Sequence, residues 1–339
     1  MDTETNRSAA MPAPEILRQL DARMCEVAIL RAALELEVWA KVAAGEDSVD
    51  QLSAIEHWDP LGTRMLLDDL CTLKLLAKEG DQYRLVPEAE YYLLPDKPTY
   101  RGRYLLADFC WEGNGRLAEA IRTGKRPIGF RATTTEAIDI WIGGYSRSWA
   151  APETYLKDCD IMWHALGIHG HDGLRVLDLA CGPAPKSLAL ALANPGVRVT
   201  LLDWERILQV ARKVAADLGV DNQVTSHSGD LRRAAYGRNQ YDVAFLGDIT
   251  HFFNPQQNIR IFRKAYDALV DEGILVVNAV RGEYLDPIEH GLWYYAISAG
   301  GAYNFQEYKD MLEHAGYTNI VDTNIVDLSI QPIKATKRV

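Results

Sequence analysis

Side chains that could do chemistry recur where apolar runs of the sequence end. Asp178, Asp203 and Asp230 each lie in or just after such a run. Gly247 ends a fourth run, and His251 follows four residues later. Carboxylates accept hydrogen bonds from hydroxyl groups, and a neutral imidazole takes up a proton near neutral pH. These residue types could therefore bind a polar small molecule and move a proton.

The apolar runs alternate with segments of helical spacing, which predicts an α/β fold. Strands are expected at residues 176–179, 197–203, 223–227, 241–247 and 273–280. Helices are expected at residues 187–193, 205–218, 255–269 and 304–315. Continuous apolar strands in this order are typical of a parallel sheet with both faces covered. Because parallel strands end at one edge of such a sheet, the polar side chains should meet there.

The loop after the first of these strands indicates what kind of ligand this edge binds. It reads Ala180-Cys-Gly182-Pro-Ala184, so it lacks the third glycine of a dinucleotide fingerprint and the Gly-Lys-Ser/Thr of a P-loop. A ligand without phosphate, held by backbone amides and a helix start, fits better. S-adenosylmethionine (SAM) is such a ligand. An ordinary strand–helix turn that binds nothing remains the alternative.

Two acids would then lie beside this loop. Asp203 is placed to accept hydrogen bonds from a ribose diol, or else to cap the following helix. Asp230 or its neighbour Leu231 could meet an adenine, or Asp230 could cap a turn. Two closing strands, near residues 317–324 and 326–334, have no helix between them. They predict an antiparallel edge hairpin, which separates SAM-methyltransferase sheets from dinucleotide-binding ones.

The first part of the chain is predicted to be a separate, mostly helical domain over residues 1–100. A long helix over residues 13–44, two shorter helices and two strands around Gly80 form a winged-helix pattern. The candidate recognition helix, residues 61–73, carries Asp68 and Asp69, a poor footprint for DNA. The broad apolar surface of the first helix favours dimerisation instead.

Residues 101–172 are predicted to be a helical linker, and residues 173–339 the catalytic domain. The linker is rich in large side chains, among them Trp111, Trp141 and Met162. They could form a roof over a substrate, because clefts at domain junctions are common ligand sites, or they could be core residues.

Composition narrows the classes of partner. The chain has 339 residues and a net charge of −11, so nucleic acids and anionic membrane surfaces are unexpected partners. No apolar run is long enough for a membrane helix. The five cysteines contain no C-x-x-C pair, which is neither a zinc pattern nor a disulfide framework. A reducing cytoplasm is expected, and no metal site.

These residues carry a family resemblance over nearly the whole chain. The chain resembles class I SAM-dependent methyltransferases of the plant caffeate/isoflavone O-methyltransferase type, which include bacterial natural-product enzymes. Residues 176–184 are similar to the family's glycine-rich loop, with alanine at two glycine positions. Leu202-Asp203-Trp204 takes the place of the ribose-binding acid, and Gly229-Asp230-Leu231 that of the adenine-contacting segment. His251 stands where the family has its general base.

The resemblance implies a Rossmann-like SAM-binding domain, a winged-helix dimerisation domain and a homodimer. The implied cofactor contacts are Asp178, Ala180, Gly182, Asp203, Trp204, Asp230, Leu231 and Gly247. The candidate substrate contacts are Trp111, Trp141, Met162, His290, Tyr294 and Tyr303.

The sequence also departs from the family. Gly247 replaces a lysine, and Phe252 and Phe253 replace Asp-Trp after the histidine. The acids that orient the histidine would fall near Asn278 and Tyr303, which are not acidic. Methylation of an oxygen on an aromatic or polycyclic small molecule is expected, with His251 as base. The alternatives are a C-methyltransferase, a SAM-binding relative that does not methylate (a cyclase, decarboxylase or hydroxylase-like enzyme), and a winged-helix regulator.

Overall fold

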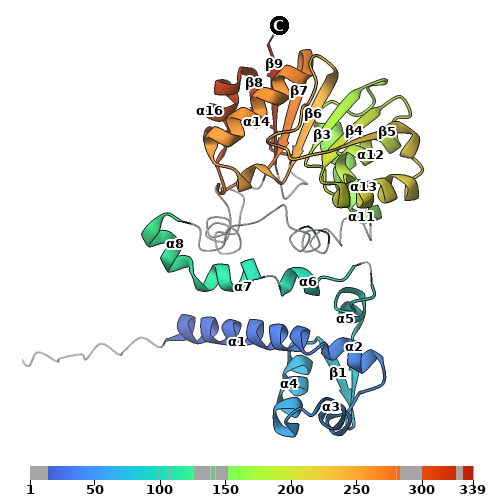
Figure 1. Ribbon diagram of the computed structural model, residues 1–339, viewed down its shortest axis with the longest axis vertical. Coiled ribbons are helices and arrows are strands. Elements are labelled where there is room, and N and C mark those ends of the chain that lie inside the picture. Colours follow the sequence, from blue (N-terminus) through green and yellow to red (C-terminus); the bar gives the residue numbers. More distant parts are fainter. Residues whose placement is uncertain are drawn as a thin grey trace, which may run out of the picture. The chain divides into compact units, whose positions relative to one another are not determined.

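The chain forms two compact units, Met1–Gly102 and Arg103–Val339, and each is described by itself. The computed structural model describes residues 14–97, 99–106, 108–125, 138, 142, 152–279, 281–282, 300–325 and 331–338 (Figure 1). Within these ranges, no helix combines the length and the apolar character needed to cross a bilayer.

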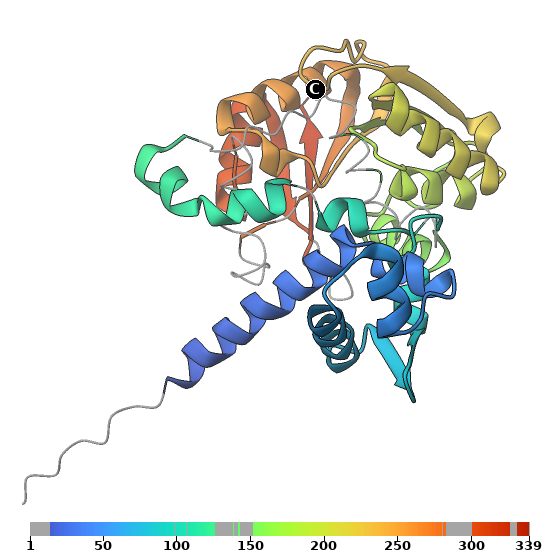
Figure 2. The same ribbon diagram turned by 60° about the horizontal axis from the view of Figure 1, so that its bottom comes forward.

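The N-terminal unit consists of short helices, one long helix and a two-stranded antiparallel sheet. In chain order its elements are α1 (Glu15–Glu35), α2 (Val38–Ala43), α3 (Val49–Glu56), α4 (Pro60–Thr72), β1 (Leu76–Glu79), β2 (Gln82–Leu85) and α5 (Pro87–Tyr92). The long helix α1 is easiest to follow in Figure 2. Helix α4 begins at Asp59, whose side chain accepts the Gly62 N–H at 2.7 Å, with Pro60 in the first turn.

The long N-terminal helix predicted over residues 13–44 is in fact two helices. Glu37 lies between them in the left-handed backbone region, with φ 55°. The break turns α2 so that Val38, Trp39 and Val42 are buried. The Trp39 indole N–H then donates to the Leu75 carbonyl at 3.1 Å. Burial of these side chains outweighs the continuous helical propensity of the segment.

The C-terminal unit is built on a seven-stranded sheet. Its strands are β3 (Arg175–Leu179), β4 (Arg198–Asp203), β5 (Val224–Ser228), β6 (Tyr241–Gly247), β7 (Leu269–Asn278), β8 (Tyr317–Asp322) and β9 (Pro332–Lys337). They lie in the order β5-β4-β3-β6-β7-β9-β8. The first five pair in parallel, whereas β9 pairs antiparallel with both β7 and β8. The mixed α/β sheet and its closing antiparallel pair are as predicted.

Helices cover both faces of this sheet, as Figure 1 shows. They are α11 (Pro152–Ala165), α12 (Pro185–Ala193), α13 (Glu205–Asp217), α14 (Pro255–Ala268) and α16 (Phe305–Ala315). One apolar core contains α11, α12 and α13, and the other contains α14 and α16. The region before α11 holds α6 (Gly102–Leu105), α7 (Asp108–Gly115) and α8 (Leu117–Thr123), and short 3-10 turns occur at Asp221–Gln223 and Thr250–Phe252.

Capping residues fix where the helices beside the carboxyl edge begin. Asn254 and Gln257 form a reciprocal capping box at the start of α14, and Asn304 and Glu307 form one at the start of α16. Each box satisfies backbone groups that a helix start leaves unpaired. Both helices therefore begin at defined positions next to the segment that carries His251.

Candidate active site

The glycine-rich loop after β3 has an unusual backbone for its sequence. Ala180, Gly182 and Ala184 all have positive φ, at 55°, 58° and 58°. Such angles are free for glycine but strained for alanine. The two alanines thus hold the conformation that glycine would adopt at these positions, and Ala184 directly precedes α12. The loop keeps a glycine-type shape despite the substitutions.

Asp203, at the end of β4, supports this loop from the neighbouring strand. Its carboxylate accepts the Gly182 N–H at 2.9 Å and the Trp204 N–H at 2.7 Å. Burial raises the pKa of Asp203 to about 6, although these two N–H groups act in the opposite direction. Each carboxylate oxygen can accept a further hydrogen bond. Hydroxyl donors of a bound ligand would satisfy that capacity and stabilise the ionised form.

Asp178 is a second buried acid at the same edge, one strand away. Ser187, in the first turn of α12, donates its hydroxyl to Asp178 Oδ2. Burial raises the pKa of Asp178 to about 7. Its other oxygen, Oδ1, is buried and has no hydrogen-bond partner among the residues that the structure describes. A buried acceptor without a hydrogen bond costs free energy, so Asp178 Oδ1 is an atom to which a donor group of a ligand could bind.

Lys186 brings a positive charge to these acids. Its Nζ lies 3.0 Å from Asp248 Oδ2, just after β6, and its side chain is 14% exposed. The Trp163 indole N–H donates to the Lys186 carbonyl at 2.6 Å, which ties α11 to this turn. A Cβ atom at Gly247 would lie 3.7 Å from the Lys186 ammonium. The Lys186 ammonium therefore lies close to position 247, where the family that this chain resembles has a lysine.

This set of groups fits a ligand that has an amino-acid end and a diol. Asp248 Oδ1, like Asp178 Oδ1, is buried without a partner in the described part of the chain. Two unpaired acid oxygens suit an ammonium group, and the Lys186 cation suits a carboxylate. Asp203 suits a ribose diol. SAM contains all three groups, so the residues present fit it.

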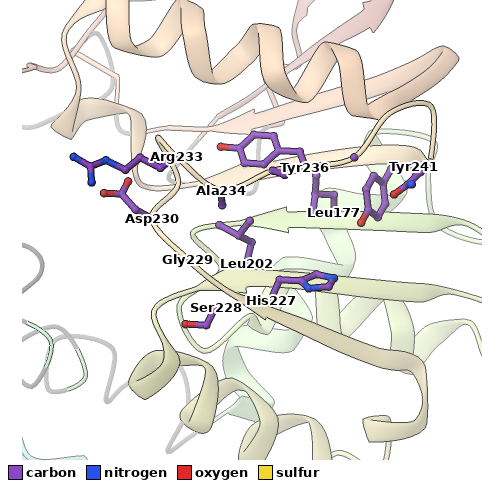
Figure 3. A pocket seen from close by; sticks show the side chains of 13 residues that line it. Leu177, Leu202, His227, Ser228, Gly229, Asp230, Arg233, Ala234, Tyr236 and Tyr241 are labelled. Atoms are coloured by element: carbon purple, nitrogen blue, oxygen red, sulfur yellow. The ribbon is translucent and has the colours of Figure 1, made fainter.

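A cavity of about 650 Å³ is lined by Leu177, Leu202 and His227 of the sheet and by the segment that connects β5 to β6. Asp230 and Arg233 stand at one end of it, and His227 and Tyr241 lie toward the other (Figure 3). The Asp230 carboxylate is paired with Arg232 at 2.6 Å, and this partner lowers the pKa of Asp230. The Leu231 side chain belongs to the apolar core. Among the predicted cofactor contacts, Asp230 is the one that lines this cavity.

His251 is buried in the short turn Thr250–Phe252, three residues beyond Asp248. Two side chains from the helices hold this turn. The Tyr308 hydroxyl lies 2.6 Å from the Thr250 hydroxyl, and the Asn258 amide donates to the Thr250 carbonyl at 3.0 Å. Neither partner stands out in the sequence, because both lie within ordinary amphipathic helices. Together they fix the backbone on which the imidazole is carried.

Tyr303 also holds this turn. Its hydroxyl donates to the Phe253 carbonyl at 2.8 Å, and its ring meets that of Tyr308 edge-on. Gly300 approaches so closely that a Cβ atom there would come within 2.3 Å of the His251 carbonyl oxygen. The carbonyl of Asn278, near which the family that the chain resembles has an orienting acid, accepts the Asp248 N–H at 2.8 Å. Tyr303, Gly300 and Asn278 therefore hold the backbone around His251 in place, and none of them supplies a carboxylate.

Two of the remaining predicted substrate contacts, Met162 and Trp111, lie among the residues that the structure describes. Met162 is buried in the apolar core beside Trp163, so its side chain is used in packing. Trp111, on α7, is 44% exposed. Trp141, His290 and Tyr294 lie outside the residues that the structure describes.

The known proteins to which the chain is similar are methyltransferases. Residues 170–316 match the family described as "Methyltransferase domain". The chain is 29% identical over 263 residues, 73% of each sequence, to the tetracenomycin polyketide synthesis 8-O-methyltransferase of Streptomyces glaucescens. It is 23% identical to the bacteriochlorophyllide d C-20 methyltransferase of Chlorobaculum tepidum, over 92% of this chain and 94% of that one.

The fold is shared with solved structures as well. Human N-acetylserotonin methyltransferase, solved in complex with SAM, superposes with a TM-score of 0.71 and 18% identity. The match covers 98% of this chain and 99% of that one. The domain match and the named relatives together show that the chain is a SAM-dependent methyltransferase.

Proposed function

We propose that the protein transfers a methyl group from SAM to a phenolic oxygen of an aromatic or polycyclic small molecule, with His251 as the general base. The observation that carries this proposal is the histidine itself. It is buried three residues beyond Asp248, on a turn held by Thr250, Tyr308 and Asn258. A base that removes a phenol proton must be held beside the methyl donor, and this turn is rigidly supported.

Cofactor contacts are proposed on the same grounds. Asp203 would accept the ribose diol, and Asp230, with Leu231 and Trp204 beside it, would lie by the adenine. Lys186 would bind the carboxylate of the amino-acid end, while Asp178 and Asp248 would accept its ammonium group. Backbone groups at Ala180, Gly182 and Gly247 would line the cofactor site between these side chains. When bound, SAM supplies an electrophilic methyl group on a sulfonium.

The acceptor is proposed to be flat and apolar. The two curated relatives methylate an oxygen in polyketide synthesis and a carbon of a bacteriochlorophyllide, as their names state. Trp111, Trp141, His290, Tyr294 and Tyr303 remain proposed contacts to such a substrate. Met162 is a weaker candidate, because its side chain is enclosed in the core.

The test uses a panel of polycyclic phenols, each with a matched O-methyl ether. We expect the phenol, incubated with SAM and the full chain, to gain one methyl group, and the ether to remain unchanged. Proton NMR should show the new methyl on oxygen. An ether that still gains a methyl, or a new methyl on carbon, would instead support C-methylation. SAM binding without transfer to any acceptor would support the alternative that the protein is a SAM-binding relative of the methyltransferases that does not methylate.

C-methylation is a real second candidate because of one observation. Neither Asn278 nor Tyr303, near which the family's orienting acids would fall, is acidic, and the Tyr303 hydroxyl donates to the Phe253 carbonyl. A family histidine that loses its orienting carboxylates is a weaker base, because its protonated form is less stabilised. An acceptor with a nucleophilic carbon needs less help from a base, so a weakly basic imidazole would suffice for it.

We further propose that the N-terminal unit is a winged-helix dimerisation domain. Helix α1 leaves a row of apolar side chains exposed on one side, namely Ile16, Leu17, Leu20, Met24 and Val27. Exposed apolar surface of this extent marks an interface. A second copy of the chain would cover it. Sedimentation of the full chain should give a dimer, and Leu20→Asp should shift it to monomer at equal concentration.

A cytoplasmic location is proposed as well. Cys25, Cys71, Cys159 and Cys181 all have free thiols in the structure. Unpaired cysteines suit a reducing compartment.

A further inference from the structure

Three side chains with metal-ligating atoms meet at the C-terminal end of α11. Asp160 Oδ1 lies 3.1 Å from His169 Nε2, and Asp160 Oδ2 lies 3.7 Å from His164 Nε2. The two imidazole rings stack, with centroids 3.6 Å apart. One ligand atom from each residue lies within 4.8 Å of the other two. The methyl-transfer site uses none of these groups.

The backbone brings this cluster together. Asp160 and His164 are four residues apart on α11, so their side chains share one face of the helix. Gly167, with φ 68°, reverses the chain after the helix ends. The N–H groups of Ile168 and His169 then both donate to the Trp163 carbonyl, at 3.0 and 3.1 Å. His169 is thereby held over the last turn of α11, beside the other two ligands.

The donor set selects a class of metal. Two imidazole nitrogens and one carboxylate oxygen suit Zn²⁺ and similar transition-metal ions, whereas Mg²⁺ and Ca²⁺ prefer oxygen ligands alone. The C-terminal end of a helix carries partial negative charge, which also favours a cation. The stacked rings must rotate for both nitrogens to face one ion. Their side chains are 59% and 23% exposed, so there is room for that rotation.

We propose that Asp160, His164 and His169 bind one Zn²⁺ ion, with water completing the coordination. The site is separate from the methyl-transfer site, because His169 leads into the start of β3 while the cofactor loop follows its end. A metal there would join α11 to the turn before the sheet. The expectation of no metal site rested on the cysteines, which do not take part.

The test measures Zn²⁺ binding to the untagged full chain after treatment with a chelator. Calorimetry should show one Zn²⁺ per chain, with no competition from Mg²⁺. His164→Ala, His169→Ala and Asp160→Asn should each weaken binding by about tenfold or more. His171→Ala is the matched control, since this histidine lies two residues further on and outside the cluster. It should bind like the unchanged chain.

A second readout separates this site from a loose surface contact. Co²⁺ in place of Zn²⁺ should give a visible absorption band that is lost in the His164 and His169 variants but kept in His171→Ala. Equal SAM binding by all variants would show that they are folded. The proposal is overturned if the unchanged chain binds no Zn²⁺, or if the cluster variants bind it as well as His171→Ala does.

Discussion

Lys186 Nζ lies 3.0 Å from Asp248 Oδ2, which joins the first turn of α12 to the residue after β6. Asp248 adopts φ 53°, a strained angle for a residue other than glycine. Strain of this kind persists where surrounding contacts enforce it, and it concentrates at functional sites. The pair therefore joins two loops of the proposed cofactor site, and it places a cation and an acid where we propose that the amino-acid end of SAM binds.

Replacing the Lys186 ammonium should weaken cofactor binding. Lys186→Met keeps most of the side-chain volume but removes the charge, so we expect the Kd for SAM to rise about tenfold or more. Calorimetry with SAM and its demethylated product measures this directly. Lys213→Met on α13 is the control, because Lys213 forms an exposed pair with Asp217.

That substitution also leaves the Asp248 carboxylate without its counterion, so loss of stability must be separated from loss of binding. The double variant Lys186→Met with Asp248→Asn removes both charges. If it recovers stability but binds SAM more weakly than Asp248→Asn alone does, the ammonium contributes to binding. Equal SAM affinity of the double variant and Asp248→Asn would count against a contact between Lys186 and the cofactor.

Asp178 should make the cofactor-free protein less stable as the pH rises. Its folded-state pKa of about 7 lies above its ordinary value of 3.8. Between these values the folded chain holds a proton that the unfolded chain releases, so the free energy of unfolding falls as pH increases. Above about pH 7 the whole penalty, on the order of a few kcal/mol, is present. Asp203, with a pKa of about 6, acts in the same direction.

Asp178→Asn should remove most of this dependence. The amide can still accept the Ser187 hydroxyl, so we expect the variant to be the more stable protein near pH 8. Denaturant unfolding at about pH 5 and pH 8 measures the slope. Asp217→Asn, on the exposed face of α13, should leave the slope unchanged. An unchanged slope in Asp178→Asn would mean that this carboxyl is not the titrating group.

Replacing either loop alanine, Ala180 or Ala184, with glycine should raise the free energy of unfolding. The left-handed region costs alanine about 1–2 kcal/mol. Glycine loses about 0.5–1 kcal/mol more than alanine in chain entropy on folding. Ala180→Gly and Ala184→Gly should therefore each stabilise the fold by about 0.5 kcal/mol. Ala216→Gly, in the exposed face of α13, should destabilise it by about 1 kcal/mol. Urea unfolding that ranks all three variants alike would contradict the strain argument.

The edge that carries the acids could be predicted from the sequence alone. Apolar runs that end in Asp203 or Gly247 imply parallel strands, and parallel strands end at one edge whatever their order. In the structure β3 pairs with both β4 and β6, which brings Asp178 between the loops that follow those two strands. The positions of the five parallel strands agree with the prediction to within four residues, because burial on both faces leaves a continuous apolar signal. The last strand was expected near residues 326–334 and is found at Pro332–Lys337.

The contacts that complete the site could not be predicted in this way. Lys186 meets Asp248 across 62 residues, and Thr250 meets Tyr308 across 58. Such pairs depend on how each helix is rotated against the sheet, and the hydrophobic pattern of a helix determines that rotation only coarsely. The left-handed break at Glu37 cannot be predicted for a related reason, since burial of Trp39 decides it and local propensity does not.

His251→Gln should separate proton transfer from cofactor binding. Glutamine has a similar size but cannot take up a proton, so we expect kcat on a phenol to fall by about a hundredfold or more. The Kd for SAM should not change. Tyr308→Phe, which removes only the bond to Thr250, should lower kcat less, because the imidazole remains but its turn is held less firmly. His314→Gln, at the end of α16, serves as the control for histidine loss.

The pH dependence of kcat distinguishes a base from a residue that only shapes the pocket. With a neutral imidazole as base, kcat should fall as the pH drops through the range in which His251 becomes protonated. His251→Gln should lose that limb of the profile, whereas Tyr308→Phe should keep it at a lower rate. If His251→Gln retains both the rate and the limb, another group or water takes the proton. Positioning by the turn would then be the whole contribution of this residue, which is the arrangement that a carbon acceptor needs.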